Sequence, residues 1–85
     1  MYTLYILRCA DGTLYTGITT DLVRRVREHN TSPVGAKYTR GRRPVTLVWS
    51  KRFRDRSRAS QEEAGVKKLS RAEKMKLVAT YKKKL

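Results

Sequence analysis

The sequence predicts a small α+β fold in which two strands, a helix, a third strand and two further helices follow one another. Three observations predict this order. Aromatic and β-branched residues fill two short runs on either side of a turn, a third such run follows Pro44, and apolar residues recur at helical spacing elsewhere. With 85 residues, the chain is expected to form one domain over residues 1–85.

The first two strands, residues 2–9 and 13–18, are expected to form a hairpin. A two-residue loop at Asp11-Gly12 would turn Tyr5 and Tyr15 to opposite faces of the sheet, because side chains alternate along a strand. A three-residue loop from Ala10 to Gly12 would place both tyrosines on one face, with glycine at the position that needs a positive φ. We favour the three-residue loop, partly because the functional interpretation below requires it.

A helix is predicted over residues 19–30, since hydroxyl groups and an acid at its start are typical helix-capping signals. Leu22, Val26 and His29 recur at helical spacing. Arg25 lies on the same stripe, three residues after Leu22 and four before His29. An arginine and a histidine should therefore border the helix face that packs on the sheet.

Residues 31–35 end this helix, and a basic, glycine-punctuated loop is predicted over residues 35–43. Two interpretations of the loop stay open. It could follow a phosphate backbone with a base stacked on Tyr38, or it could be a mobile surface loop. A third strand is predicted from Val45 to Phe53, with Pro44 at its start, where proline is tolerated.

From Arg56 onward the pattern is helical, and Ala59, Glu63 and Val66 share one stripe. Residues 70–73 resemble a capping box that starts a last helix. The residues expected to line the buried face of that helix are Met75, Val78, Tyr81 and Leu85. The basic tail of residues 82–84 would complement the negative helix end.

Charge is the strongest bulk signal, because 21 Lys and Arg against 7 Asp and Glu give a net charge of +14. Such a domain favours an anionic partner, with nucleic acid first and a membrane surface second. No apolar run approaches the roughly 20 residues of a membrane span, and no lipidation motif is present. Cys9 is the only cysteine, so an internal disulfide is excluded and a cytoplasmic location is expected. Charge does not distinguish cutting from binding.

Phosphodiester hydrolysis needs an activated water and stabilisation of charge on the phosphoryl oxygens, commonly from a carboxylate-held metal ion. Most acids have another explanation: Asp11 in the turn, Asp21 and Glu73 at helix starts, and Glu28 and Asp55 as solvated residues. Glu62 and Glu63 remain, and Glu63 faces inward on its stripe, which suits a one-metal site. Alternatively, residues 60–63 form a capping box with Glu63 as the cap partner.

The other polar candidates also have two interpretations. Tyr5 and Tyr15 are either core aromatics or phenols that position or activate the attacking water. His29 is either a packed histidine or a proton acceptor near neutral pH. Arg25 either clamps the scissile phosphate or joins Arg24 and Arg27 in contacts to backbone phosphates.

These residues match a known pattern, and the chain resembles the GIY-YIG nuclease superfamily, in particular its small stand-alone bacterial members of the UPF0213 type. Residues 3–5, Thr-Leu-Tyr, stand for the first signature, and residues 15–17, Tyr-Thr-Gly, for the second. Residues 21–29 carry the family's Arg and His four apart, residues 35–39 look like a loop of this subgroup, and residues 59–74 look like its final two helices.

The resemblance implies a three-stranded antiparallel sheet flanked by helices. It also implies a metal-dependent DNA endonuclease, with a role in DNA repair or recombination, that holds one Mg²⁺ or Mn²⁺ on Glu63. The catalytic set carried over is Tyr5, Tyr15, Arg25, His29 and Glu63, with Gly12 and Gly17 as structural residues. The expected nucleic-acid-binding residues are Arg24, Arg27, Lys37, Tyr38, Arg40, Arg42 and Arg43. The alternative function is a non-catalytic basic module that binds DNA or RNA.

The chain departs from the family pattern at several positions. Thr3 and Leu4 replace the glycine and isoleucine of the first signature, and Thr16 replaces the isoleucine of the second. Larger members carry an asparagine after the glutamate helix, but no asparagine follows Asn30 here. Larger members also find DNA through extra domains, so targeting is expected to come from this chain's own basic surface or from a partner.

Overall fold

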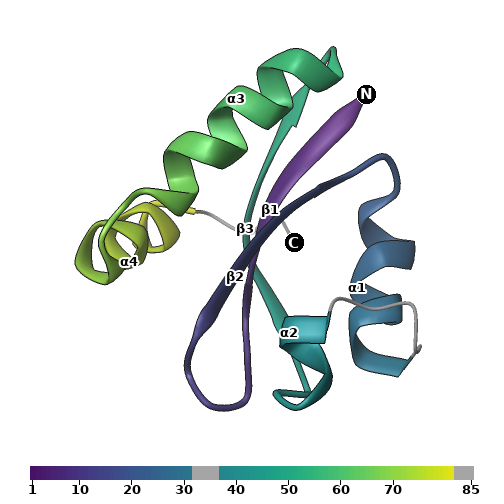
Figure 1. Cartoon of the computed structure of the whole chain (residues 1–85), viewed down its shortest axis with the longest axis vertical. Coiled ribbons are helices and arrows are strands. Elements are labelled where there is room, and N and C mark those ends of the chain that lie inside the picture. Colours follow the sequence, from purple (N-terminus) through teal and green to yellow (C-terminus); the bar gives the residue numbers. More distant parts are fainter. Residues whose placement is uncertain (32–36, 82–85) are drawn as a thin grey trace.

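The computed structural model describes residues 1–31 and 37–81. Its elements are β1 (Tyr2–Arg8), β2 (Leu14–Thr19), α1 (Leu22–Thr31), α2 (Lys37–Arg40), β3 (Thr46–Phe53), α3 (Arg56–Lys67) and α4 (Arg71–Ala79). The strands form one antiparallel sheet in the order β2-β1-β3. The predicted fold class is confirmed, and the short helix α2 is an addition to the predicted order (Figure 1).

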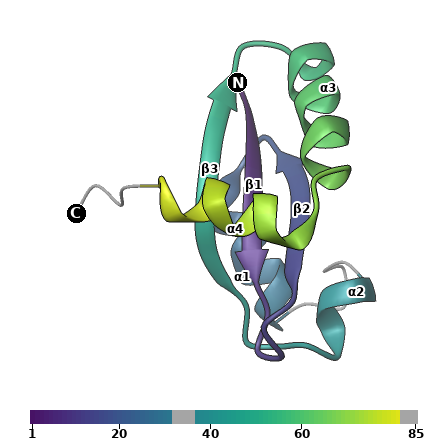
Figure 2. The same ribbon diagram turned by 90° about the vertical axis from the view of Figure 1, so that its left-hand side faces the viewer.

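The central strand β1 supplies buried side chains to both faces of the sheet. Tyr5 and Leu7 belong to one core cluster, which α1 covers with Leu22 and Val26. The second cluster lies on the opposite face around Leu4, Ile6 and Trp49, where Val66, Leu77, Val78 and Tyr81 of the C-terminal segment pack. Figure 2 shows α4 crossing this second face, with α1 behind the sheet and α3 alongside β2. Among the described helices, none has the length and apolar character of a membrane span.

The hairpin between β1 and β2 has the three-residue loop. Leu7 pairs with Tyr15, and the amide of Cys9 donates to the carbonyl of Thr13 at 2.8 Å. Gly12 closes the loop with a φ of +85°, a conformation that glycine adopts without the steric cost of a Cβ. This register turns Tyr5 to the same face as Tyr15, and the two-residue alternative is wrong.

Polar side chains cap the long helices. Asp21 accepts a hydrogen bond from the amide of Arg24 at the start of α1, as the helix signal predicted. Ser70 and Glu73 form the predicted capping box of α4. Asp55, interpreted from sequence as merely solvated, is the N-cap of α3 and accepts from the amide of Arg58. The alternative capping box over residues 60–63 is therefore wrong, because those residues lie inside α3.

Part of the predicted basic loop is helical, which neither interpretation of the loop included. Residues 37–40 form α2, and Thr39 within it is fully buried. The hydroxyl of Thr39 hydrogen-bonds the ring of His29, and this contact joins α2 to α1. Residues 35 and 36 of the predicted loop lie outside the described residues.

The orientation of α4 differs from the prediction at one position. Val78 and Tyr81 pack on the second core cluster as predicted, and Leu77 joins them. Met75 is 40% exposed, contrary to the prediction, because the stripe facing the sheet runs through positions 74, 77, 78 and 81. The predicted contact of Leu85 and the basic tail of residues 82–84 lie outside the described residues.

Candidate active site

The ring of Tyr5 lies across the edge strand β2 at Gly17. A Cβ added to Gly17 would lie 2.6 Å from the phenol oxygen of Tyr5 and 2.8 Å from its Cζ. The two residues face each other in the register of β1 and β2, and both are buried. Glycine at this position therefore provides the space in which the phenol group reaches the side of β2.

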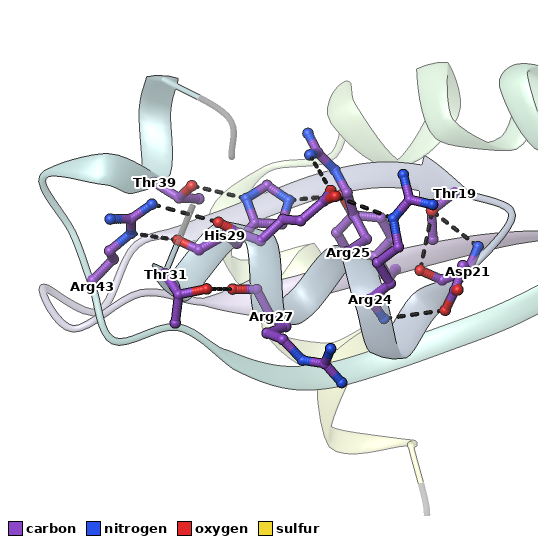
Figure 3. Close-up of polar contacts among 11 residues, drawn as sticks. Thr19, Asp21, Arg24, Arg25, Arg27, His29, Thr31, Thr39 and Arg43 are labelled. Atoms are coloured by element: carbon purple, nitrogen blue, oxygen red, sulfur yellow. Dashed lines mark hydrogen bonds and ion pairs between the residues drawn. The ribbon is translucent and has the colours of Figure 1, made fainter. Parts of the chain in front are cut away.

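His29 of α1 connects the phenol of Tyr5 to α2. Its Nε2 lies 2.9 Å from the phenol oxygen, and its Nδ1 lies 2.8 Å from Oγ1 of Thr39. The ring is fully buried, and this burial, with the positive charges of Arg25 and Arg43, lowers the pKa of His29 to about 4. His29 is consequently neutral at pH 7, with both ring nitrogens occupied (Figure 3).

The phenol of Tyr5 keeps its proton at neutral pH. Burial, together with neighbouring Tyr15, raises the pKa of Tyr5 to about 12. A hydrogen bond from Arg25 acts in the opposite direction, and the negative charge of Glu63 adds to the increase. Because Arg25 donates to the phenol oxygen, the network is satisfied when the phenol donates to Nε2 of His29 and Nδ1–H donates to Thr39.

Tyr15 is the more exposed of the two signature tyrosines. Its ring centroid lies 6.4 Å from that of Tyr5, 5.1 Å from that of His29 and 5.8 Å from that of Tyr38. Tyr15 is half-buried, whereas Tyr5 is only 1% exposed. The predicted pair of phenols thus forms one aromatic cluster, in which Tyr15 lies nearer to solvent.

Arg25 is fixed between two site groups. One guanidinium nitrogen lies 3.0 Å from Oε1 of Glu28, and the guanidinium also hydrogen-bonds the phenol of Tyr5. Glu28 further binds Arg24 at 3.1 Å, and these two arginines lower the pKa of its carboxyl. Glu28 was expected to be merely solvated, but its carboxylate orients Arg25.

Glu63 approaches from α3, the helix that lies alongside β2 (Figure 2). Its side chain is 22% exposed, pairs with Lys67 at 3.3 Å, and acts electrostatically on Tyr5. Among the residues that the structure describes, no three His, Cys, Asp or Glu side chains gather as metal ligands. Mg²⁺ keeps several waters and often binds one or two carboxylates plus substrate phosphates, so the Glu63 carboxylate fits such a site.

Two of the seven expected nucleic-acid-binding residues make extensive internal contacts. Arg43 donates to the backbone carbonyl of His29 at 2.6 Å (Figure 3). Arg42 lies 4.1 Å from the ring centroid of Tyr38 and pairs with Asp11 at 3.0 Å. The remaining five residues, all of them exposed, are Arg24, Arg27, Lys37, Tyr38 and Arg40.

Sequence reasoning missed three residues that shape this site. Thr39 orients His29, Glu28 orients Arg25, and Asn30 bonds both backbone groups of Val45 at 2.7 and 3.1 Å. The role of Glu28 could have been found from the sequence, because Glu28 follows Arg25 by three residues, a spacing at which helical side chains meet. No local pattern marks Thr39, whose contact depends on how α2 packs against α1.

The GIY-YIG catalytic domain matches residues 1–77 of the sequence. The chain therefore belongs to the GIY-YIG catalytic domain family, as the two tyrosine signatures and the ββαβαα order predicted. This family is a nuclease family, which implies a nucleic-acid substrate.

The comparison also places the chain among UPF0213 proteins. One from Desulfotalea psychrophila is 56% identical over 80 residues, which cover 94% of this chain and 73% of that protein. One from Natronomonas pharaonis is 58% identical over 76 residues, covering 89% and 88%. The solution NMR structure of a UPF0213 protein from Bacillus halodurans is 49% identical, has a TM-score of 0.60, and covers 93% of this chain and 84% of that one.

Proposed function

We propose that this protein is a metal-dependent endonuclease that hydrolyses phosphodiester bonds in DNA. The observation that supports it best is the convergence of the predicted catalytic residues. Tyr5, Tyr15 and His29 lie in ring contact, Arg25 bonds the Tyr5 phenol, and the charge of Glu63 acts on that same phenol. These residues come from β1, β2, α1 and α3, so only folding brings them together.

The partly exposed members of the cluster are assigned to the substrate. Glu63 would hold one Mg²⁺ or Mn²⁺, an ion that supplies charge stabilisation at the phosphoryl oxygens and acidifies bound water. Arg25 presents forked donors suited to the scissile phosphate. Tyr15 positions the attacking water, because it is the phenol nearer to solvent.

Tyr5 and His29 form a buried proton path behind these groups. As the water oxygen bonds to phosphorus and the bond to the leaving oxygen breaks, the phenol oxygen of Tyr5 accepts the water proton while its own proton moves along the hydrogen bond to Nε2 of His29. The leaving oxygen takes a proton from solvent. The low pKa of His29 makes its protonation transient, so the imidazole releases its extra proton to solvent after the step.

A cleavage panel with Mg²⁺ or Mn²⁺ over single strands, duplexes, flaps, branched junctions and RNA tests the proposal. Glu63→Gln should lower cleavage by about two orders of magnitude or more, with binding changed less than about twofold because one partly exposed carboxyl contributes little to affinity. Glu62→Gln is the matched control, one residue away and exposed, and should cleave like the parent.

Equal cleavage by the Glu63 and Glu62 variants would move the metal site elsewhere.

In the same panel, Tyr15→Phe should retain the aromatic cluster and lose most cleavage. Full activity of this variant would contradict the role assigned to the Tyr15 hydroxyl. Binding without turnover on every substrate and with both metals would favour the alternative, a non-catalytic nucleic-acid-binding module. RNA cleavage without DNA cleavage would change the substrate class. A role in repair or recombination stays a prediction.

A further inference from the structure

A polar hollow of about 210 Å³ lies beside the hairpin, outside the catalytic cluster. Its lining comes from the hairpin, α2 and α4: Thr13, Leu14, Tyr38, Arg71 and Lys74. Figure 2 shows α2 and the beginning of α4 on the β2 side of the sheet. Neither cation belongs to the residues that sequence reasoning selected for nucleic-acid binding.

The two cations are held over the hollow by the fold. Arg71 donates to the backbone carbonyl of Gly12 at 3.0 Å, which ties α4 to the hairpin loop. Lys74 lies three residues after Arg71, a helical spacing that places both side chains on the same face of α4. Lys74 is half-buried while its neighbour Met75 is 40% exposed, although lysine is the residue that normally remains in water.

Among the described residues, no acid forms an ion pair with Arg71 or Lys74. Within the described parts of the chain, the ion pairs involve other cations, and Glu73 is engaged in the capping box of α4. Asp11, the acid of the nearby loop, is paired with Arg42. The hollow therefore presents two uncompensated positive charges, an arrangement that suits an anionic group.

The hollow is also contiguous with the catalytic cluster. Tyr38 lines it, and the ring of Tyr38 lies 5.8 Å from that of Tyr15. Tyr15 in turn contacts Tyr5, on which the charge of Glu63 acts. A chain of aromatic contacts thus runs from the site of cleavage to the two cations.

We infer that this hollow binds a backbone phosphate of the substrate strand that flanks the phosphate being cleaved. Lys74 and the free donors of Arg71 neutralise that phosphate, so the strand follows the edge of the sheet from Glu63 past Tyr15 to the start of α4. The inference rests on the proposed function, since it names a second contact of the same substrate.

Binding of a labelled DNA oligonucleotide, measured without metal so that no cleavage occurs, tests the hollow. Lys74→Gln should weaken binding about fivefold to tenfold and reduce the slope of log K against log salt by about one. Lys76→Gln on the same helix, exposed and outside the hollow, is the matched control and should change neither quantity by as much. Thermal unfolding should be nearly unchanged in both variants.

A second measurement locates the contact on the strand. A single neutral methylphosphonate is moved along the oligonucleotide, and one position should weaken binding to the parent but not to Lys74→Gln. Equal effects of the Lys74 and Lys76 variants, or the absence of any position whose effect depends on Lys74, would overturn the inference while leaving the nuclease proposal intact. Absence of nucleic-acid binding would overturn both. A Lys74 effect in a protein that never cleaves would contradict only the catalytic proposal.

Discussion

Gly17 is constrained by space and not by backbone conformation. Its φ is not positive, yet a Cβ at this position would overlap the phenol of Tyr5. The glycine of the second signature therefore acts on the tyrosine of the first. This relation explains why Gly17 and Tyr5 must be considered together, although twelve positions separate them in the sequence.

Gly17→Ala should displace the Tyr5 ring and break its geometry with His29. We expect a loss of about 1–3 kcal/mol in the free energy of unfolding, as for other overpacked cores, and a larger loss of cleavage than of binding. Denaturant unfolding and the cleavage panel measure both quantities. Gly65→Ala is the control, because open space surrounds its added Cβ within α3 and it should stabilise by about 0.5–1 kcal/mol. Unchanged stability and cleavage in Gly17→Ala would contradict the steric argument.

His29 makes stability depend on pH. Its folded pKa is about 4 against 6.5 for the ordinary side chain, so the unfolded chain binds more protons between these values. The stabilisation is complete above pH 6.5 and is lost as pH falls towards 4, in total about 3 kcal/mol.

Denaturant unfolding between pH 4.5 and 7.5 should therefore show stability rising with pH. His29→Gln is expected to be less stable at pH 7 and to show a flatter profile. The carboxyls with lowered pKa, those of Asp11, Glu28 and Glu73, act in the same direction but titrate mainly below this window. A parent profile that is flat over the window would show that His29 is not buried in its neutral form.

The hairpin is the element whose details matter most for the site. A loop of three residues places Tyr5 and Tyr15 on one face, and a loop of two would separate them. The glycine at the position that needs a positive φ was one ground for choosing the three-residue loop, and the functional interpretation was the other. The structure confirms that choice.

Gly12→Ala should strain this turn, since an L residue at a φ of +85° carries a Cβ penalty of about 1–2 kcal/mol. We expect a comparable loss in the free energy of unfolding, measured by denaturant titration. Gly41→Ala, which has no positive φ and open space around its added Cβ, should be nearly neutral. If Gly12→Ala lowered the free energy of unfolding as little as Gly41→Ala does, the loop would have relaxed into another turn.

At the scale of the molecule, the net charge of +14 comes from two kinds of basic side chain: some make contacts inside the protein, and others are exposed to solvent. Arg25, Arg42 and Arg43 contact the groups that build the site. Four further exposed arginines lie at the end of β3, in the turn after it and at the start of α3: Arg52, Arg54, Arg56 and Arg58. A basic composition therefore predicts the class of partner, but it does not identify which cations meet that partner.

Binding to DNA should weaken steeply with salt, because several lysines and arginines release counterions from phosphates. For about six contacts we expect the association constant to fall roughly 10³-fold between 50 and 200 mM salt. Fluorescence anisotropy at several salt concentrations measures the slope. Affinity that is nearly independent of salt would contradict a phosphate-dominated interface and with it the interpretation of the net charge.

Local spacing and turn chemistry in the sequence predicted the order of the strands and of the three longer helices, and the capping box of α4. They also favoured the hairpin register that the structure shows. The candidate catalytic set came from the resemblance to the family and stays a prediction. The sequence did not determine the burial of His29, the roles of Thr39 and Arg43, or the exposure of Met75. Those follow from the packing of elements distant in sequence, which sets the rotation of a helix and the partner of each polar atom. The electrostatic effect of Glu63 on Tyr5 likewise needed the tertiary structure, since no local pattern places α3 beside the edge strand.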